Sequence, residues 1–520
     1  MPSERAEHLL PCPNAVLKGL TGNRSAPPDV LLRLADASNP ERFELLSRPD
    51  VPPEALVVLA EQGGSRWDRW ELACHQGLPA QAMSILAVDP DAGVRARLAW
   101  GAIPTDPQSF FQNAVALPRE VFELLLHDSE QSVRHALPRN PGLGIVARRR
   151  GADVDATREA RELWAVLRDH PDPAVACRAA ANGPALPVDR VARLFMRATT
   201  DYARERILAN LEDMLPTSIA HEMLAFLDGE SAGSRDLDES VPDDDSGAVE
   251  RGARAALLQQ IAEVVILDGA LVEQFLADPR LRAAVAANPT LSGKQVVALA
   301  GDRDNEVRKA VVARHDLDPV LRESISVDYH GCENFVPWLE DASLAECERL
   351  ALAHSRHEVV RKTLALRPDL SDTIVETLAH DASRVVRVIL CENHPEAPAW
   401  LLEQTVADGI GHSRAGFVAH KNFPLATAIA MARSIDTADR NHAISHSGLP
   451  LDVLEALISD DAAIVRCSAA RHPTVQGARL IELVNTLDPA VVQGAAENPN
   501  LPPTVMHELL DATGIRPLRP

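Results

Sequence analysis

The chain has 520 residues, a formal net charge of -23 and 46% hydrophobic residues, but only 3% aromatic residues. This composition provides enough apolar side chains for a large core and predicts an interior of Leu, Ala and Val, which suits closely packed helices. The charge disfavours nucleic acid as a partner, because an anionic surface repels a phosphate backbone unless basic residues gather on one face.

The cysteines and the N-terminal residues indicate in which cellular compartment the protein is expected. The seven cysteines are widely spaced and form no Cys-x-x-Cys pair, which favours free thiols in a reducing compartment. Residues 1–20 (MPSERAEHLLPCPNAVLKGL) carry charges and prolines where a signal peptide needs an apolar run. No apolar stretch reaches the roughly 18 residues of a membrane span. We therefore expect a soluble, cytoplasmic protein without membrane attachment.

The first region, residues 1–227, repeats a local pattern at irregular intervals. We define a register mark as a residue that takes the place of Arg308 in the segment EVRKA, and an apolar residue follows nine positions after most marks. Early marks are 25 to 27 residues apart, but later intervals stretch to 39 and 43, which predicts insertions between residues 104 and 200. The marks of this region are Leu17, Arg42, Arg69, Arg95, Arg134, Cys177 and Arg206.

The second region, residues 228–247 (DGESAGSRDLDESVPDDDSG), interrupts the pattern with eight acidic residues against Arg235. It has no apolar face with which to bury surface, which predicts an acidic disordered loop. The alternative is a binding site for a basic partner or for divalent ions, although the spacing of an EF-hand is missing.

The third region, residues 248–520, repeats every 26 or 27 residues. The segments RAAVAANPTLS (282–292) and RKAVVARHDLD (308–318) show two successive copies. Each copy predicts a short Ala-rich helix that ends near a proline or glycine, followed by a second helix with Leu and Val three and four residues apart. The marks are Arg282, Arg308, Phe335, Arg361, Arg387, Arg414, Arg440, Arg466 and Val492.

Helices of this length cannot bury their apolar faces alone. Two helices of roughly eight to twelve residues are only about 12 to 18 Å long, so neighbouring copies must stack to form a shared core. We therefore predict an all-α fold, an α-solenoid of about sixteen two-helix repeats without a sheet.

An aspartate lies six residues before many of the arginine marks. Asp89, Asp381 and Asp460 precede Arg95, Arg387 and Arg466 in this way. Such an aspartate can cap the next helix, and the arginine can reach the equivalent aspartate of a neighbouring repeat. We favour this structural ladder; the alternative is a row of arginines that binds a ligand, formed by Arg361, Arg387, Arg414, Arg440 and Arg466.

A histidine column follows the marks at a constant distance. Each histidine lies six residues after its mark, in the column that also holds Asn288, Asn393 and Asn498; its members are His420, His446 and His472. His442 and His446 form an HxxxH pair that can present two nitrogens to zinc, but helices ~8–10 Å apart are too distant to share one ion. We expect a polar residue that ends the first helix, and we expect Cys391 near His394 to be a buried thiol rather than a nucleophile.

The Asp and Val-Arg arrangement resembles that of HEAT-like repeats. The short unit and the segments ANPTLSGKQVVALAGD and ENPNLPPTVMHELLDA look more like the bacterial leucine-rich repeat variant family, over residues 17 to 510 with gaps. This resemblance implies a right-handed superhelix of α and 3₁₀-like helices without strands. One type of member carries an N-terminal iron-sulfur cluster, which we do not expect here because Cys12 stands far from Cys74.

These features together favour a non-catalytic scaffold that binds a protein or peptide along an extended surface. The chain contains no GxGxxG segment behind a strand, no Walker loop, no GxSxG and no HExxH, and we predict no cofactor and no metal. The row of arginines and the histidine column are its possible interaction surface. The alternative is a HEAT-like nucleic-acid-binding protein of the alkyl-base DNA glycosylase kind, which requires the arginines to face solvent without Asp partners.

Overall fold

The computed structural model describes residues 10–101, 117–140, 143, 154–183, 185–233, 245–329, 335–336, 338–341, 344–409 and 413–516. Within these residues all regular elements are helices, apart from two isolated β-bridges that pair Leu186 with Leu211 and Leu215 with Val265. The predicted all-α fold class is therefore confirmed for the described chain. No helix in this part of the chain is both long and apolar enough to cross a membrane.

Contacts divide the chain into two compact units. The terminal unit combines Met1–Gln62 with Tyr329–Pro520, and the middle unit is Gly63–Asp328. These boundaries differ from the division at residues 228–247 that the sequence suggested. The terminal unit thus unites both ends of the chain.

The terminal unit consists of short helices in pairs. Each register mark from Arg361 onward lies in the first helix of a pair. The helices are α1 (Pro13–Gly22), α2 (Pro28–Leu34), η1 (Arg42–Ser47), α3 (Pro53–Gln62), α22 (Trp338–Asp341), α23 (Glu346–Ala353), α24 (Glu358–Ala365), α25 (Asp372–Ala379), α26 (Arg384–Asn393), α27 (Ala399–Ala407), α28 (Arg414–Ala419), α29 (Leu425–Ala432), α30 (Thr437–Ala443), α31 (Leu451–Ile458), α32 (Ala463–Arg471), α33 (Ala478–Leu483), α34 (Pro489–Glu497) and α35 (Pro503–Ala512).

The middle unit is built in the same way. Its helices are α4 (Arg66–Leu72), α5 (Ala80–Leu86), α6 (Ala92–Trp100), α8 (Arg119–Leu126), α9 (Gln131–Ala136), η2 (Leu137–Arg139), α11 (Val154–Arg168), α12 (Pro173–Asn182), α13 (Val188–Arg197), α14 (Asp201–Leu208), α15 (Thr217–Gly233), α16 (Asp245–Val264), α17 (Gly269–Ala277), α18 (Arg282–Ala287), α19 (Gly293–Ala300), α20 (Asn305–Val312) and α21 (Pro319–Ser324).

Caps and prolines in the sequence set the helix ends. The side chain of Asp488 accepts hydrogen bonds from the N–H groups of Ala490 and Val491, which caps α34 at its start. Pro489 stands at the first helical position, where its missing N–H costs nothing. The helix ends before Asn498, because Pro499 excludes a helical conformation for the preceding residue.

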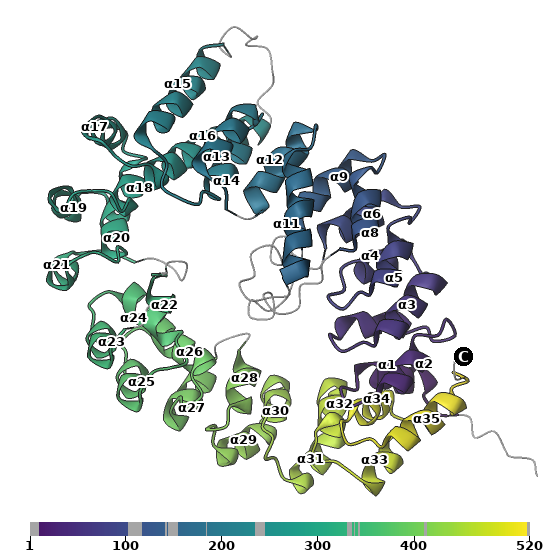
Figure 1. Cartoon of the computed structure of the whole chain (residues 1–520). Helices are drawn as coiled ribbons and strands as arrows, with labels where there is room; N and C mark the ends of the chain where they lie inside the picture. Colours follow the sequence, from purple (N-terminus) through teal and green to yellow (C-terminus); the bar gives the residue numbers. More distant parts are fainter. Residues whose placement is uncertain are drawn as a thin grey trace, which may run out of the picture. The chain divides into compact units, whose positions relative to one another are not determined.

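First helices pack on first helices along each unit. In the terminal unit α24, α26, α28, α30, α32 and α34 contact one another in succession, and Figure 1 shows them as one row beside the second helices. In the middle unit the row comprises α4, α6, α9, α12, α14, α16, α18 and α20. We call each of these a first-helix row. The predicted insertion does not interrupt the row, because α9 contacts α12 directly while α11 packs beside α12.

The apolar residue nine positions after the mark lies in the core in most of the described repeats, as expected. Leu449, Val475 and Leu501 are at most 2% exposed. The repeat of Arg387 departs from the pattern: the exposed Glu396 stands nine positions after the mark, and Ala397 takes the buried place because α26 extends to Asn393. One extra helical residue explains the shift.

The two ends of the chain meet inside the terminal unit. Helix α1 packs on α34 as the next member of the first-helix row, and α2 contacts α35. The contact is close: a Cβ atom at Gly19 would overlap the carbonyl oxygen of Gln493. The N-terminal repeat therefore continues the stack where the C-terminal repeat leaves it.

The segment that the sequence predicted as an acidic disordered loop, residues 228–247, is helical where the structure describes it. Helix α15 continues to Gly233, and α16 begins at Asp245, so both ends of the segment 228–247 are helical. Residues 234–244 lie outside the described residues.

Candidate interaction surface

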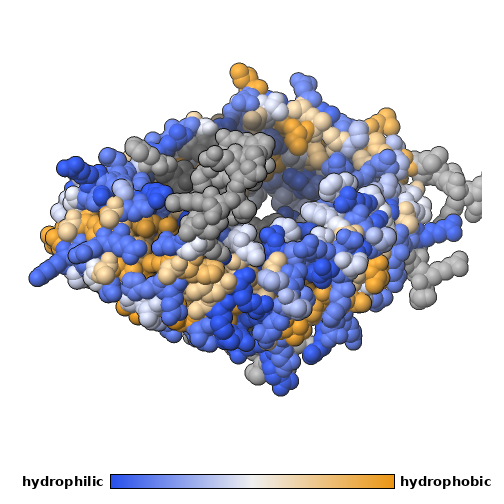
Figure 2. All heavy atoms as spheres, turned by 90° about the horizontal axis from the view of Figure 1, so that it is seen from above, coloured by the Kyte–Doolittle hydropathy of each residue, from blue (hydrophilic) through white to orange (hydrophobic). Residues whose placement is uncertain are grey.

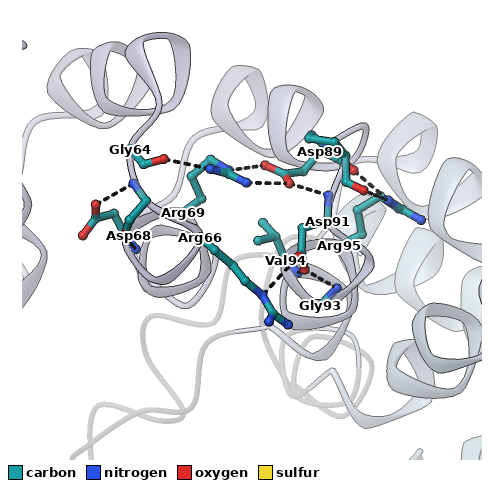
Figure 3. Close-up of polar contacts among 11 residues, drawn as sticks. Gly64, Arg66, Asp68, Arg69, Asp89, Asp91, Gly93, Val94 and Arg95 are labelled. Carbon is teal, nitrogen blue, oxygen red and sulfur yellow. Dashed lines mark hydrogen bonds and ion pairs between the residues drawn. The ribbon is translucent and has the colours of Figure 1, made fainter.

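The predicted ladder of arginines and aspartates is present in the middle unit. Figure 3 shows Arg69 of α4 reaching Asp89, which precedes α6, with 2.7 Å between Nε and Oδ2. Arg95 of α6 pairs in the same way with Asp128, at 2.6 Å, and also donates to the carbonyl of Asp89. Each aspartate thus holds the arginine of the repeat before it through its side chain and its own repeat's arginine through its backbone.

The ladder recurs in the terminal unit and contains three of the candidate arginines. The Nε to Oδ2 distances are 2.5, 2.6 and 2.7 Å for Arg361–Asp381, Arg440–Asp460 and Arg466–Asp488. The hydrogen bond from Arg440 lowers the pKa of Asp460 below its usual range. The structural interpretation of the ladder is confirmed at these pairs.

The other two candidate arginines are held differently. Arg414 pairs with Asp439 inside α30, at 2.8 Å, instead of with an aspartate before the helix. Arg387 donates to the carbonyl oxygens of Asp381 and Ala382, at 2.6 and 3.3 Å, and forms no ion pair with a described carboxylate. Four of the five candidate arginines therefore carry a carboxylate partner.

The histidine column also forms a ladder between repeats. The Nε2 atoms of His420 and His472 lie 3.2 Å from the carbonyl oxygens of His394 and His446, one repeat earlier. His446 contacts the carbonyl of Phe423 at 3.1 Å. Each Nδ1 accepts the N–H of the residue two positions later, as from Asn422 at 3.1 Å, so Nε2 carries the proton.

Asparagine does the same work at other members of this column. Nδ2 of Asn498 donates to the carbonyls of Ala470 and His472, and its Oδ1 accepts the N–H of Asn500 at 2.9 Å. Asn288 and Asn23 repeat this arrangement. The prediction for Asn393 is wrong: this side chain is exposed and bonds to Ile389, while His394 fills the column one residue later.

The sequence also hid an arginine version of the column. Arg314 donates to the carbonyls of Ala286 and Asn288 in the preceding repeat, and Asp316 holds the rest of its guanidinium. Arg48 with Asp50 and Arg367 with Asp369 follow the same plan. The recurring Arg-x-Asp spacing was the available signal.

Neither a metal centre nor a nucleophile emerges from the residues singled out in the sequence. No group of three His, Cys, Asp or Glu side chains in the described chain has the geometry to hold a metal ion. Burial raises the pKa of Cys391 to about 11, which keeps the thiol protonated, and the sulfur lies 3.8 Å from the hydroxyl of Thr405. His394 belongs to the column described above and does not orient Cys391.

An open groove crosses the first-helix row of the terminal unit and encloses about 550 Å³. Five neighbouring helices contribute to it: α28, α30, α32, α34 and α1, through Ala415, Asn441, Ser468, Glu497 and Gly22. The groove was not predicted, because α1 joins it only through the contact between the chain ends. Of the candidate residues, only His472 lines it.

The walls of this groove include charged and polar side chains. Arg471 and Glu497 form an ion pair at 2.8 Å, and Arg24 is exposed beside them. Oδ1 of Asn441 is buried and accepts no hydrogen bond from a described residue. Figure 2 shows hydrophilic and hydrophobic residues intermixed over the face in view, with apolar side chains in small groups. Such surfaces suit an amphipathic segment better than a wholly apolar one.

Comparison with known proteins adds no family: no protein-family model and no curated protein matches this chain.

Proposed function

We propose that the protein is a non-catalytic scaffold that binds a peptide segment of another protein along its first-helix row. The groove over five neighbouring first helices carries this proposal. Four intervals of ~8–10 Å make about 32–40 Å, which corresponds to roughly ten to twelve residues of extended chain at ~3.3 Å each. A groove of this form suits a linear segment better than a compact small molecule, which binds in an enclosed pocket.

Polar groups of the groove suit backbone recognition. An extended peptide presents an N–H and a C=O at every residue, and both need partners when they are buried. Ser445 and Ser468 line the groove and offer hydroxyl groups to such a backbone. Such contacts fix the direction of the bound segment, while apolar side chains such as Ile444 supply contact area.

We also propose that the chain is an α-solenoid of about sixteen repeats, a right-handed superhelix of the leucine-rich repeat variant kind, located in the cytoplasm. The succession of contacts in each first-helix row supports the repeat architecture. For a nucleic-acid-binding protein of the glycosylase kind, the arginines at the marks would have to be free of acidic partners. The ion pairs of Arg361, Arg414, Arg440 and Arg466 argue against that alternative.

A peptide selection with a matched pair of variants tests the proposal. Ala415 lines the groove on α28, and Ala430 is exposed on α29 in the second row of helices. Twelve-residue peptides selected on the full chain from a random displayed library should bind the A415W variant at least about tenfold more weakly, because the indole fills the groove. The A430W variant should bind them within about twofold of the wild type.

Two outcomes would overturn the proposal. One is a library from which no peptide is enriched over an uncoated surface. The other is a set of enriched peptides that bind both tryptophan variants equally well, since their site would then lie outside the groove.

A further inference from the structure

Three of the six tryptophans of the chain lie on two neighbouring first helices of the middle unit. Trp67 and Trp70 belong to α4, and Trp100 ends α6. Trp67 is 70% exposed and Trp100 is 38% exposed. A chain with so few aromatic residues gains nothing in stability by leaving two indoles in water, and exposed tryptophan is typical of binding surfaces.

Arginines alternate with these indoles. The guanidinium carbon of Arg97 lies 4.8 Å from the ring centroid of Trp70 and 5.4 Å from that of Trp100. The guanidinium carbon of Arg139, at the end of η2, lies 5.5 Å from the ring centroid of Trp100. The rings of Trp67 and Trp70 meet edge to face at 6.0 Å. We call Trp67, Trp70, Arg97, Trp100 and Arg139 the Trp–Arg run; it crosses α4, α6 and η2.

The run is held in place before any ligand arrives. Arg97 is only 9% exposed, and its Nε donates to the sulfur of Cys74. Stacking between two indoles fixes its plane, which limits the conformational entropy lost on binding. The indoles therefore form preordered platforms for apolar or planar side chains.

The positive charge of Arg139 in the Trp–Arg run has no described acidic partner. Arg139 is exposed and forms no ion pair with a described carboxylate, in contrast to Arg69 and Arg95 on the same helices. Arg178 on α12 follows along the first-helix row, and its pKa is lowered by burial first and by the positive charge of Arg139 second. The charge of Asp172 offsets part of this repulsion at Arg178, whereas Arg139 lacks a described carboxylate partner and can pair with an anionic group of a ligand.

We propose that the Trp–Arg run binds an acidic peptide segment with aromatic or aliphatic side chains, its carboxylates pairing with Arg139 and Arg178 and its apolar groups packing on Trp67 and Trp100. This inference rests on the proposed function, since it assigns the partner class of the first-helix row in the middle unit. From α4 to Arg178 on α12 the proposed binding site spans three helix intervals, ~24–30 Å, or roughly eight residues of extended chain.

A short acidic segment fits the charges better than a nucleic acid strand does. Asp68, Glu71 and Asp91 lie on or beside the same helices, and the whole chain carries a net charge of -23. A long phosphate backbone would reach beyond the arginines into this negative field, which acts over ~10 Å at physiological salt. By contrast, Arg139 and Arg178 can neutralise the one or two carboxylates of a short peptide segment.

The test uses the full chain and a fluorescein-labelled eight-residue peptide that carries two Glu residues among Phe, Leu and Ser. We expect binding with a Kd below about 100 µM, and at least about tenfold weaker binding to the W100A and R139E variants. Arg139→Lys should restore most of the affinity lost in R139E. Matched controls are W400A, which removes an indole 40% exposed on α27, and R303E at another exposed arginine of the middle unit.

The outcomes separate this inference from the proposed function. Equal binding of a peptide with Lys in place of the acids, no binding of the acidic peptide, or no effect of R139E and W100A overturns the assignment of the Trp–Arg run. Tighter binding of a twelve-nucleotide oligothymidylate also overturns it and identifies a nucleic acid surface. If library peptides still distinguish A415W from A430W, the proposed function survives that failure.

Discussion

Two joints in the terminal unit can be compared directly. One joins α32 to α34, which are successive repeats in the sequence; the other joins α34 to α1, which are the two ends of the chain. In the first, Asn498 donates to carbonyls of α32, and a Cβ at Gly494 would overlap the carbonyl of Cys467. In the second, Asn23 donates to carbonyls at the end of α34, and Gly19 makes the close approach. Spatial order in the stack therefore does not require chain continuity.

Among the changes considered, removal of the asparagine at either joint should lower the free energy of unfolding most. Asn498→Ala removes the donor to the carbonyl of Ala470 and one of two donors to the carbonyl of His472, and Asn23→Ala does the same to Ala496 and Asn498. Each change should lower the free energy of unfolding by about 3 kcal/mol, because each buried unpaired group costs ~1–3 kcal/mol. Hydrogen exchange of the α34 amides and the urea midpoint measure the loss.

Asn393→Ala is the matched control, since this side chain is exposed and bonds only within its own helix. A much smaller loss for Asn23→Ala than for Asn498→Ala would break the comparison, because the joint between the chain ends would then add little stability.

The close approach at the glycines should cost less to disturb. Gly494→Ala and Gly19→Ala each push a Cβ into a backbone carbonyl of the next helix. We expect a loss of about 1–2 kcal/mol in each, since overpacking costs ~1–3 kcal/mol and the better helix propensity of alanine returns part of it. Gly416→Ala in α28, where nothing lies within 4 Å, should stabilise instead. Thermal midpoints of the three variants decide the matter, and a neutral Gly19→Ala would show that α1 packs loosely.

The smallest expected effect is the pH dependence of stability that a histidine in the column adds and an asparagine does not. Burial lowers the pKa of His472 below the ordinary value of 6.5. The unfolded chain then binds the proton more readily, so stability is complete above pH 6.5 and falls as the pH drops from there through the folded pKa. Protonation of His472 also places a hydrogen on Nδ1, which can then no longer accept the hydrogen bond from the N–H of Thr474.

Replacement of this histidine by the residue found in the next repeat tests the assignment. His472→Asn should keep the contact with His446 and lose part of the decrease in urea midpoint between pH 7.5 and pH 5. An unchanged pH dependence would assign the decrease to other groups.

How much the sequence could predict depends on how local each signal is. The marks, the buried positions nine residues later and the Asp–Arg ladder follow from a pattern inside one repeat, and the structure bears them out at Arg95, Arg361 and Arg440. The column was only partly predicted, because Asn, His and Arg-x-Asp look unrelated until their hydrogen bonds to the preceding repeat are seen. A search at a constant spacing of six residues after the mark could not find His394, because α26 contains one extra residue.

Long-range features were out of reach for a physical reason. A pattern within one repeat specifies the next helix face but not which face covers the last repeat, so neither the contact of Gly19 with α34 nor the groove could be derived. The Trp–Arg run depends on Arg97 and Trp70 meeting across two helices. Their positions one and two residues after successive marks were the only local sign.

The union of both chain ends in one unit has a consequence for biosynthesis. Residues 13–22 are synthesised well before α34, the helix that covers them, because the two helices are far apart in the sequence. At ~5–20 residues per second the delay is on the order of half a minute. Throughout that time the apolar face of Val16, Leu17 and Leu20 lacks the helix that covers it in the folded chain.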